Sequence, residues 1–194
     1  MPSIHFRSLA IACAVAVGGF AVVGCTTTRP DNQASATSSR ASIDAQVDAA
    51  LSKLYSNVKG SREMVAASSG VLVFPAVVGA SMGVGAEYGR GALRMNGRTQ
   101  AYYSTTAGSV GFQAGAQSKA VIYVFNTPAA LDKFRNSKGW TAGADATVAA
   151  ATIGANGSID TNTIRQPVVG FVLTNVGLEA GVSLSGAKIT EIRL

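Results

Sequence analysis

The stretch GVGAEYGRG, residues 83–91, places four glycines among nine residues. Because alternate residues of a strand point to opposite faces, these glycines and Gly79 share one face with Glu87, and Tyr88 and Arg90 join an otherwise apolar face. Each glycine inside a strand costs roughly 0.5–1 kcal/mol relative to alanine, so five cost about 2.5–5 kcal/mol. Whole proteins are stable by only about 5–15 kcal/mol. We therefore predict that strong curvature of the sheet, or close approach of a second backbone, requires these glycines.

Two further segments, residues 109–117 and 177–185, also alternate glycine and polar residues with apolar ones, which predicts two more strands of this kind. The glycines of the first segment do not fit a dinucleotide-binding motif, since Tyr88 stands at the third glycine position of G-x-G-x-x-G. They do not mark a pair of membrane helices either, because Glu87, Arg90 and Arg94 interrupt the apolar run.

Turn signals define how the strands are connected. Asn96-Gly97 predicts a two-residue hairpin, Asn156-Gly157 predicts a second one, and Ser185-Gly186 joins the last two strands by a weaker signal. VLVF, residues 71–74, predicts a short buried strand ended by Pro75, and KAVIYVF, residues 119–125, predicts another.

Two helices complete the expected fold. Thr127-Pro128 begins a helix near residues 128–136, and Ser42 caps an amphipathic helix near the N-terminus. The apolar stripe of the amphipathic helix consists of Ile43, Val47, Ala50, Leu51, Leu54 and Val58. The helix could bind a membrane through this stripe. Its polar face mixes acids with lysines, however, which favours packing on the domain. We expect an α+β domain with a curved, glycine-rich, mainly antiparallel sheet or partial barrel.

The N-terminus predicts export and lipid attachment. Residues 1–24 have the short basic start and apolar run of a signal peptide, and Val22-Val23-Gly24-Cys25 resembles a bacterial lipobox. A transmembrane anchor is the alternative, but the run is shorter than the ~20 apolar residues that span a bilayer. We expect Cys25 to carry diacylglyceryl and N-acyl (palmitate) chains, residues 25–40 to contain a flexible tether, and residues 41–194 to form the domain.

Removal of residues 1–24 excludes much of enzyme chemistry. His5, the only histidine, and Cys13, the only cysteine besides Cys25, lie in that segment. The mature chain then has no histidine for a catalytic triad or a metal site and no disulfide, and its acids are scattered. A carboxylate pair brought together by the fold stays possible, but we expect no enzyme, no metal and no cofactor.

Basic residues exceed acidic ones by 6, and by 5 once Arg7 is removed with the signal peptide. The candidate contacts for anionic lipid headgroups are Lys53, Lys59, Arg62, Arg90, Arg94 and Arg98. Ordinary solvated charge is the alternative explanation. The basic residues are too dispersed to indicate nucleic-acid binding.

Five fragments, in this order and spacing, resemble the SYLF domain family over about residues 41–194. They are GVLVFP (70–75), GVGAEYGRGAL (83–93), YYSTTAGSVGFQAGAQ (102–117), VIYVFNTPAALDKF (121–134) and GADATVAAA (143–151). The chain departs from the family at Gly79, where a lysine is common, and at Ala151-Thr152, where Gly-Pro often stands.

The resemblance implies lipid binding, since eukaryotic SYLF domains bind phosphoinositide membranes and yeast relatives also bundle actin. A bacterial envelope offers no actin and usually no phosphoinositides. We therefore expect a lipoprotein that binds phospholipid or a membrane surface, placed in the outer membrane because Thr26, not Asp, follows Cys25. The alternative is a non-enzymatic structural lipoprotein that holds an envelope protein or a cell-wall component.

Overall fold

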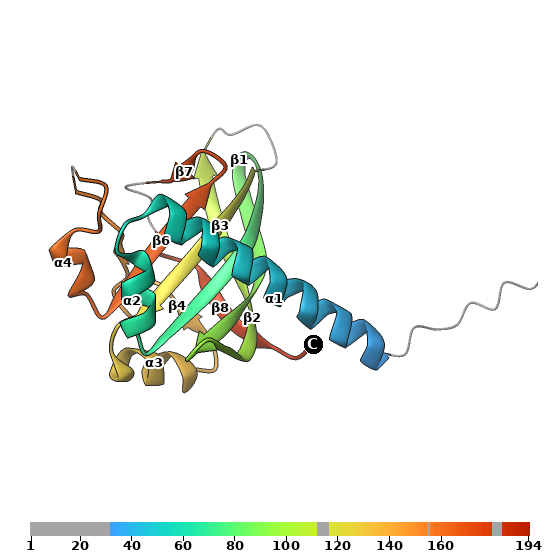
Figure 1. Cartoon of the computed structure of the whole chain (residues 1–194). Coiled ribbons are helices and arrows are strands. Elements are labelled where there is room, and N and C mark those ends of the chain that lie inside the picture. Colours follow the sequence, from blue (N-terminus) through green and yellow to red (C-terminus); the bar gives the residue numbers. More distant parts are fainter. Residues whose placement is uncertain (1–31, 112–116, 155, 180–183) are drawn as a thin grey trace, which may run out of the picture. The chain divides into compact units, whose positions relative to one another are not determined.

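The structure is a computed structural model that describes residues 32–111, 117–154, 156–179 and 184–194. These residues belong to the compact unit Asp31–Leu194. The elements are α1 (Asn32–Asn57), α2 (Ser61–Ala67), β1 (Gly70–Met95), β2 (Arg98–Gly111), β3 (Gln117–Phe125), α3 (Pro128–Arg135), β4 (Trp140–Thr141), β5 (Ala149–Ala150), α4 (Thr161–Ile164), β6 (Val168–Thr174), β7 (Gly177–Leu178) and β8 (Lys188–Ile192) (Figure 1). In this part of the chain, no helix has the length and hydropathy that a membrane crossing requires.

A single curved sheet forms the centre of the unit, with the strand order β4-β8-β2-β1-β3-β6-β5 and β7 attached to β6. Its strands pair antiparallel except for β5 and β6, which run parallel. Long strands connected by hairpins curl round in Figure 1, and α1 lies across the sheet. The predicted α+β fold with a curved, mainly antiparallel sheet is confirmed.

β1 is one strand of 26 residues, so the prediction that a strand ends at Pro75 is wrong. Its first half pairs with β3 and its second half with β2. The register to β3 shifts between Phe74 and Val77, and Pro75 lies in this irregularity. A proline is tolerated there because the missing N–H is not needed in the hydrogen-bond ladder.

Two glycines of β1, Gly89 and Gly91, lie where its two halves approach each other. A Cβ placed on Gly91 would lie 2.0 Å from the carbonyl oxygen of Val73, and one on Gly89 would lie 2.9 Å from that of Ala76. Real side chains do not tolerate these distances, so only glycine fits. The predicted approach of a second backbone is confirmed, and that backbone is the first half of the same strand.

The opposite face of β1 is exposed to solvent between residues 86 and 90. Tyr88 is 51 % exposed, and Ala86 and Arg90 are also exposed, so this stretch does not turn an apolar face to the core. The face that lacks side chains is the inner one, because it is the face on which the backbones meet.

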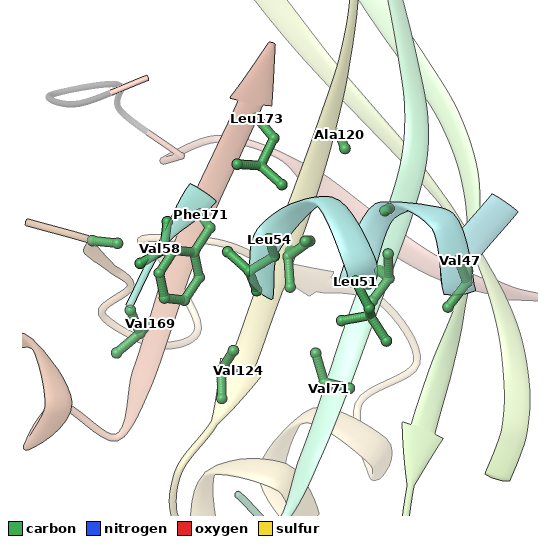
Figure 2. Close-up of a cluster of buried hydrophobic side chains, with 14 of the residues drawn as sticks. Val47, Leu51, Leu54, Val58, Val71, Ala120, Val124, Val169, Phe171 and Leu173 are labelled. Atoms are coloured by element: carbon green, nitrogen blue, oxygen red, sulfur yellow. The ribbon is translucent and has the colours of Figure 1, made fainter. Parts of the chain in front are cut away.

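α1 covers one side of the sheet with the apolar stripe that the sequence predicts, and all six residues of the stripe are buried. Figure 2 shows Val47, Leu51, Leu54 and Val58 directed toward side chains of β1, β3 and β6. Packing on the domain is therefore confirmed for this helix. Its predicted start is wrong: α1 begins at Asn32 and not after Ser42, so residues 32–40, expected to belong to the tether, are helical.

The inner side of the sheet holds a second cluster that is rich in aromatic residues. Trp140, Phe134 and Phe125 pack in tilted or edge-to-face pairs, with ring centroids 5.0–6.3 Å apart. Burial in this cluster raises the pKa of Tyr103 to about 12. Trp140 is 1 % exposed, so its fluorescence reports on the core and not on the surface. Both clusters lie within residues 43–189, and a unit with its own core is expected to fold without residues 1–30.

The remaining local predictions have mixed outcomes. Asn96 and Gly97, with φ of 50° and 74°, form the predicted hairpin turn between β1 and β2, and α3 and β3 lie where expected. Asn156-Gly157 lies in a turn flanked by an isolated bridge rather than by paired strands.

The strand predicted over 177–185 extends only over β7 in the described residues, and residues 180–183 lie outside them. Ser185-Gly186 forms a turn, but β7 pairs with β6, whereas β8 pairs with β2 and β4. Of the strand predicted over 109–117, residues 112–116 also lie outside the described part.

The contact inside β1 gives a stability test. Gly91→Ala is expected to lower the free energy of unfolding by at least about 3 kcal/mol, because the methyl group overlaps a backbone oxygen that cannot move aside cheaply. Gly108→Ala in β2 is the control, since a Cβ there meets nothing within 4 Å, and we expect a gain of no more than about 1 kcal/mol. Urea unfolding of both variants measures the difference, and equal stabilities would contradict the close approach.

Candidate functional site

Arg94 connects the second half of β1 to α1. Its guanidinium lies 2.7 Å from the carboxylate of Asp48 and 3.9 Å from that of Asp44, and it donates a hydrogen bond of 3.1 Å to the backbone oxygen of Asp44. The Arg94 side chain is only 14 % exposed. This geometry gives Arg94 a structural role, in contrast to the exposed arginines of the candidate set.

The carboxylate of Asp44 holds the start of β2 to the same helix. It accepts hydrogen bonds of 2.8 Å from the Thr99 hydroxyl and 2.9 Å from the Tyr102 hydroxyl. Burial, followed by this hydrogen bond to Asp44, raises the pKa of Tyr102. Sequence reasoning noted Asp44 and Asp48 only as charges of a mixed polar face, although their i, i+4 spacing places both on one side of a helix.

Lys53, Lys59 and Arg62 lie around the end of α1 and the start of α2. Lys59 and Arg62 are exposed and Lys53 is half-buried. The Arg62 guanidinium lies 4.4 Å from the centre of the Tyr55 ring, a cation–π contact. Burial raises the pKa of Tyr55, and the nearby positive charges of Arg62 and Arg94 oppose this shift.

Arg90 and Arg98 are exposed on the β1–β2 hairpin. Arg90 pairs with Ser104 across the two strands, and Arg98 follows the turn, opposite Met95. The six candidate residues thus form no single cluster: three lie at the α1–α2 junction, Arg94 lies under α1, and two lie on the hairpin. Cys25 and the predicted signal peptide lie outside the described residues.

A second ion pair crosses from β1 to β3. Lys119 donates a hydrogen bond of 2.9 Å to the carboxylate of Glu87, and the two side chains are 23 % and 20 % exposed. The sequence placed Glu87 on the face of the glycines but did not predict its partner, because strand pairing decides which lysine faces it. In the described part of the chain, no group of three acidic, histidine or cysteine side chains could hold a metal ion.

Many carboxylates of the domain are engaged in internal contacts. Arg7, Arg29 and Asp31 lie outside the described residues, which leaves 14 basic and 9 acidic side chains in residues 32–194. Asp44, Asp48 and Glu87 form ion pairs. The carboxylates of Asp145 and Asp160 accept backbone N–H groups of Thr141 and Asn162. Three of these acids are paired with two basic residues and the other two with backbone N–H groups, so residues 32–194 keep a net excess of five basic side chains.

The geometry defines a class of protein before any comparison: an α+β domain with a strongly curved sheet, a helix fixed over one side and an excess of exposed positive charge. A family model described as "Ysc84: Las17-binding protein actin regulator" matches residues 106–193. This match confirms the SYLF family resemblance over the C-terminal part of the chain. The motifs at 70–75 and 83–93 precede the matched residues. No curated protein matches the chain.

The role of Arg94 can be tested by its removal. Arg94→Met is expected to lower the free energy of unfolding by about 1–2 kcal/mol, because it breaks the connection to α1, while the exposure of Asp48 limits the effect. Arg98→Met, at an exposed position of the same hairpin, should change it by less than about 0.5 kcal/mol. Equal effects of the two substitutions in urea unfolding would contradict a structural role for Arg94.

Proposed function

We propose that the chain is a bacterial outer-membrane lipoprotein, acylated at Cys25, whose SYLF-like domain binds phospholipid or a membrane surface without catalysing a reaction. The observation that carries the proposal is the excess of basic over acidic side chains in residues 32–194, 14 against 9, with exposed basic residues among them such as Arg90, Arg98 and Lys188. Each basic residue near an anionic bilayer adds about 1 kcal/mol of attraction. The match to the SYLF family supports binding in general.

The matching family is described as binding Las17 and regulating actin. We do not extend either activity to this chain, because the lipobox-like sequence at Val22–Cys25 directs it to an envelope without actin. A structural lipoprotein that holds an envelope protein or a cell-wall component is the second candidate. The well-packed core on both sides of the sheet favours adhesion by the surface of the domain under either proposal.

Lipid attachment is tested first. When the full chain is produced in a Gram-negative bacterium fed with labelled palmitate, the wild type should carry the label and fractionate with the outer membrane. Cys25→Ser should carry none, because its hydroxyl replaces the thiol that accepts the diacylglyceryl group. An unlabelled wild type would contradict acylation, and fractionation with the inner membrane would contradict the proposed location.

Membrane binding is tested without the acyl chains. A chain beginning at Asp31 should float with vesicles that contain phosphatidylglycerol, float less with pure phosphatidylcholine, and lose binding as salt is added, because salt screens exposed charges beyond about 10 Å at 0.1 M. If the chain floats with neither kind of vesicle, the domain does not bind membranes. Co-sedimentation with isolated cell wall would then favour the second candidate.

A further inference from the structure

The second half of β1, β2 and β8 present three paired strands whose outward side chains lie in two rows. Tyr88, Thr106 and Lys188 form one row, since Tyr88 pairs with Thr106 and Thr106 pairs with Lys188. The second row consists of Arg90, Ser104 and Thr190. We call these six residues the outer sheet face. Neighbouring strands are about 4.8 Å apart, so Arg90 and Lys188 are about 10 Å apart across the strands.

The outer sheet face is open to solvent. Tyr88 is 51 % exposed, Arg90, Thr106, Lys188 and Thr190 are also exposed, and Ser104 is half-buried. The row between them points inward and is buried: it consists of Gly89, Thr105 and Ile189. α1 packs farther along the same side, against Ala92 and Tyr102, and leaves the two rows uncovered.

Charge is separated between the two sides of these strands. Arg90 and Lys188 lie on the outer sheet face, which has no carboxylate among its residues. Glu87 and Glu191 lie at the alternate, inward positions: Glu87 pairs with Ala107 and contacts Lys119, whereas Glu191 pairs with Tyr103. The alternation of the strands therefore presents positive charge and hydroxyl groups on the outer sheet face and places neither acid on it, although Glu191 is exposed at the end of β8.

We propose that the outer sheet face is the surface by which the domain binds an anionic bilayer; this inference rests on the membrane-binding function proposed above. The two cations attract phosphate headgroups. The tyrosine side chain, which is apolar with a polar tip, suits the depth of the membrane interface. The exposed hydroxyl groups of Thr106 and Thr190 can donate hydrogen bonds to headgroup oxygens. Because three paired strands hold these groups side by side, all of them can contact the surface of one bilayer at the same time.

The basic residues at the α1–α2 junction fit this role less well. Arg62 contacts the Tyr55 ring and is followed by Glu63, and Lys53 is half-buried. No strand or helix aligns Lys59 with the other two, since it lies between α1 and α2. Lys188 was absent from the sequence-based candidates because its position in one row with Thr106 and Tyr88 depends on the pairing of β8 with β2, which no local signal predicts.

The test compares double variants with matched charge in the chain beginning at Asp31. Vesicles contain equal parts of phosphatidylglycerol and phosphatidylethanolamine, and binding is measured by flotation over a lipid titration. Arg90→Gln with Lys188→Gln should lower the partition coefficient about 25-fold, or about five-fold for each cation. Tyr88→Ser alone should lower it measurably without a change of charge. The control, Arg135→Gln with Arg165→Gln, removes two exposed charges elsewhere and should lower it less than about two-fold.

Each outcome decides between named alternatives, provided that urea unfolding shows that every variant is folded. If the outer-face variants bind as the wild type does, the inference is overturned, whether or not Lys53→Gln with Lys59→Gln reduces binding. If the wild type itself does not bind vesicles, the proposed membrane function fails and the inference fails with it. If vesicle binding is unchanged but cell-wall binding falls in the outer-face variants, the face binds glycan and not lipid.

Discussion

The close contact between Gly91 and the backbone of Val73 is the constraint on which the rest of the sheet depends. It joins two halves of one strand that are paired with different neighbours, β3 on one side and β2 on the other. Since β6 follows β3 and β8 follows β2, the position of every other large strand is set by how closely those halves approach. A side chain at this point would separate the halves and loosen the aromatic cluster between them. The conformational cost of glycine is thus offset by packing that no other residue permits.

Charge in this domain is arranged by the same strand alternation that arranges its core. Glu87, which points inward, forms an ion pair with Lys119, and the acids of α1 form ion pairs with Arg94. These carboxylates therefore connect elements of the fold. Such contacts hold elements in place more than they add stability, because partly exposed ion pairs contribute little. Their consequence for the surface is larger: cations without such partners are left facing solvent. We infer that the same placement of charged residues has two effects. The acids hold elements of the fold together, and the remaining basic residues can bind an anionic partner at the surface.

Features with a local physical cause could be predicted from the sequence. The alternation of glycines along β1, the Asn96-Gly97 turn, the proline-initiated helix α3 and the apolar stripe of α1 each depend on neighbouring residues, and each is confirmed. The continuity of β1 through Pro75 could not be predicted, because it depends on where the bulge falls against β3. The start of α1 was missed for a similar reason. Residues 32–41 are rich in serine, threonine and alanine without an apolar stripe, but a packed helix nucleus at residues 43–58 can propagate into them.

For the candidate residues, the chemical type could be predicted from the sequence, but their grouping could not. The sequence placed Arg90 and Tyr88 on one face of a strand, which the register confirms, but it could not separate a solvent-facing arginine from one held under a helix. The difference between Arg90 and Arg94 arises because α1 crosses the strand at one of these positions only. Where a helix crosses a strand that is distant in the sequence cannot be predicted from the pattern of residues in one sequence.

The early start of α1 also restricts how far the domain can work from its anchor. If Cys25 is acylated as proposed, seven residue steps separate it from Asn32, and a chain of that length spans at most about 25 Å even when fully extended. A connecting segment of this length would keep the domain close to the leaflet that holds the acyl chains. The protein would then act on its own membrane, or on molecules that come to it, and would not reach across the envelope to a distant one.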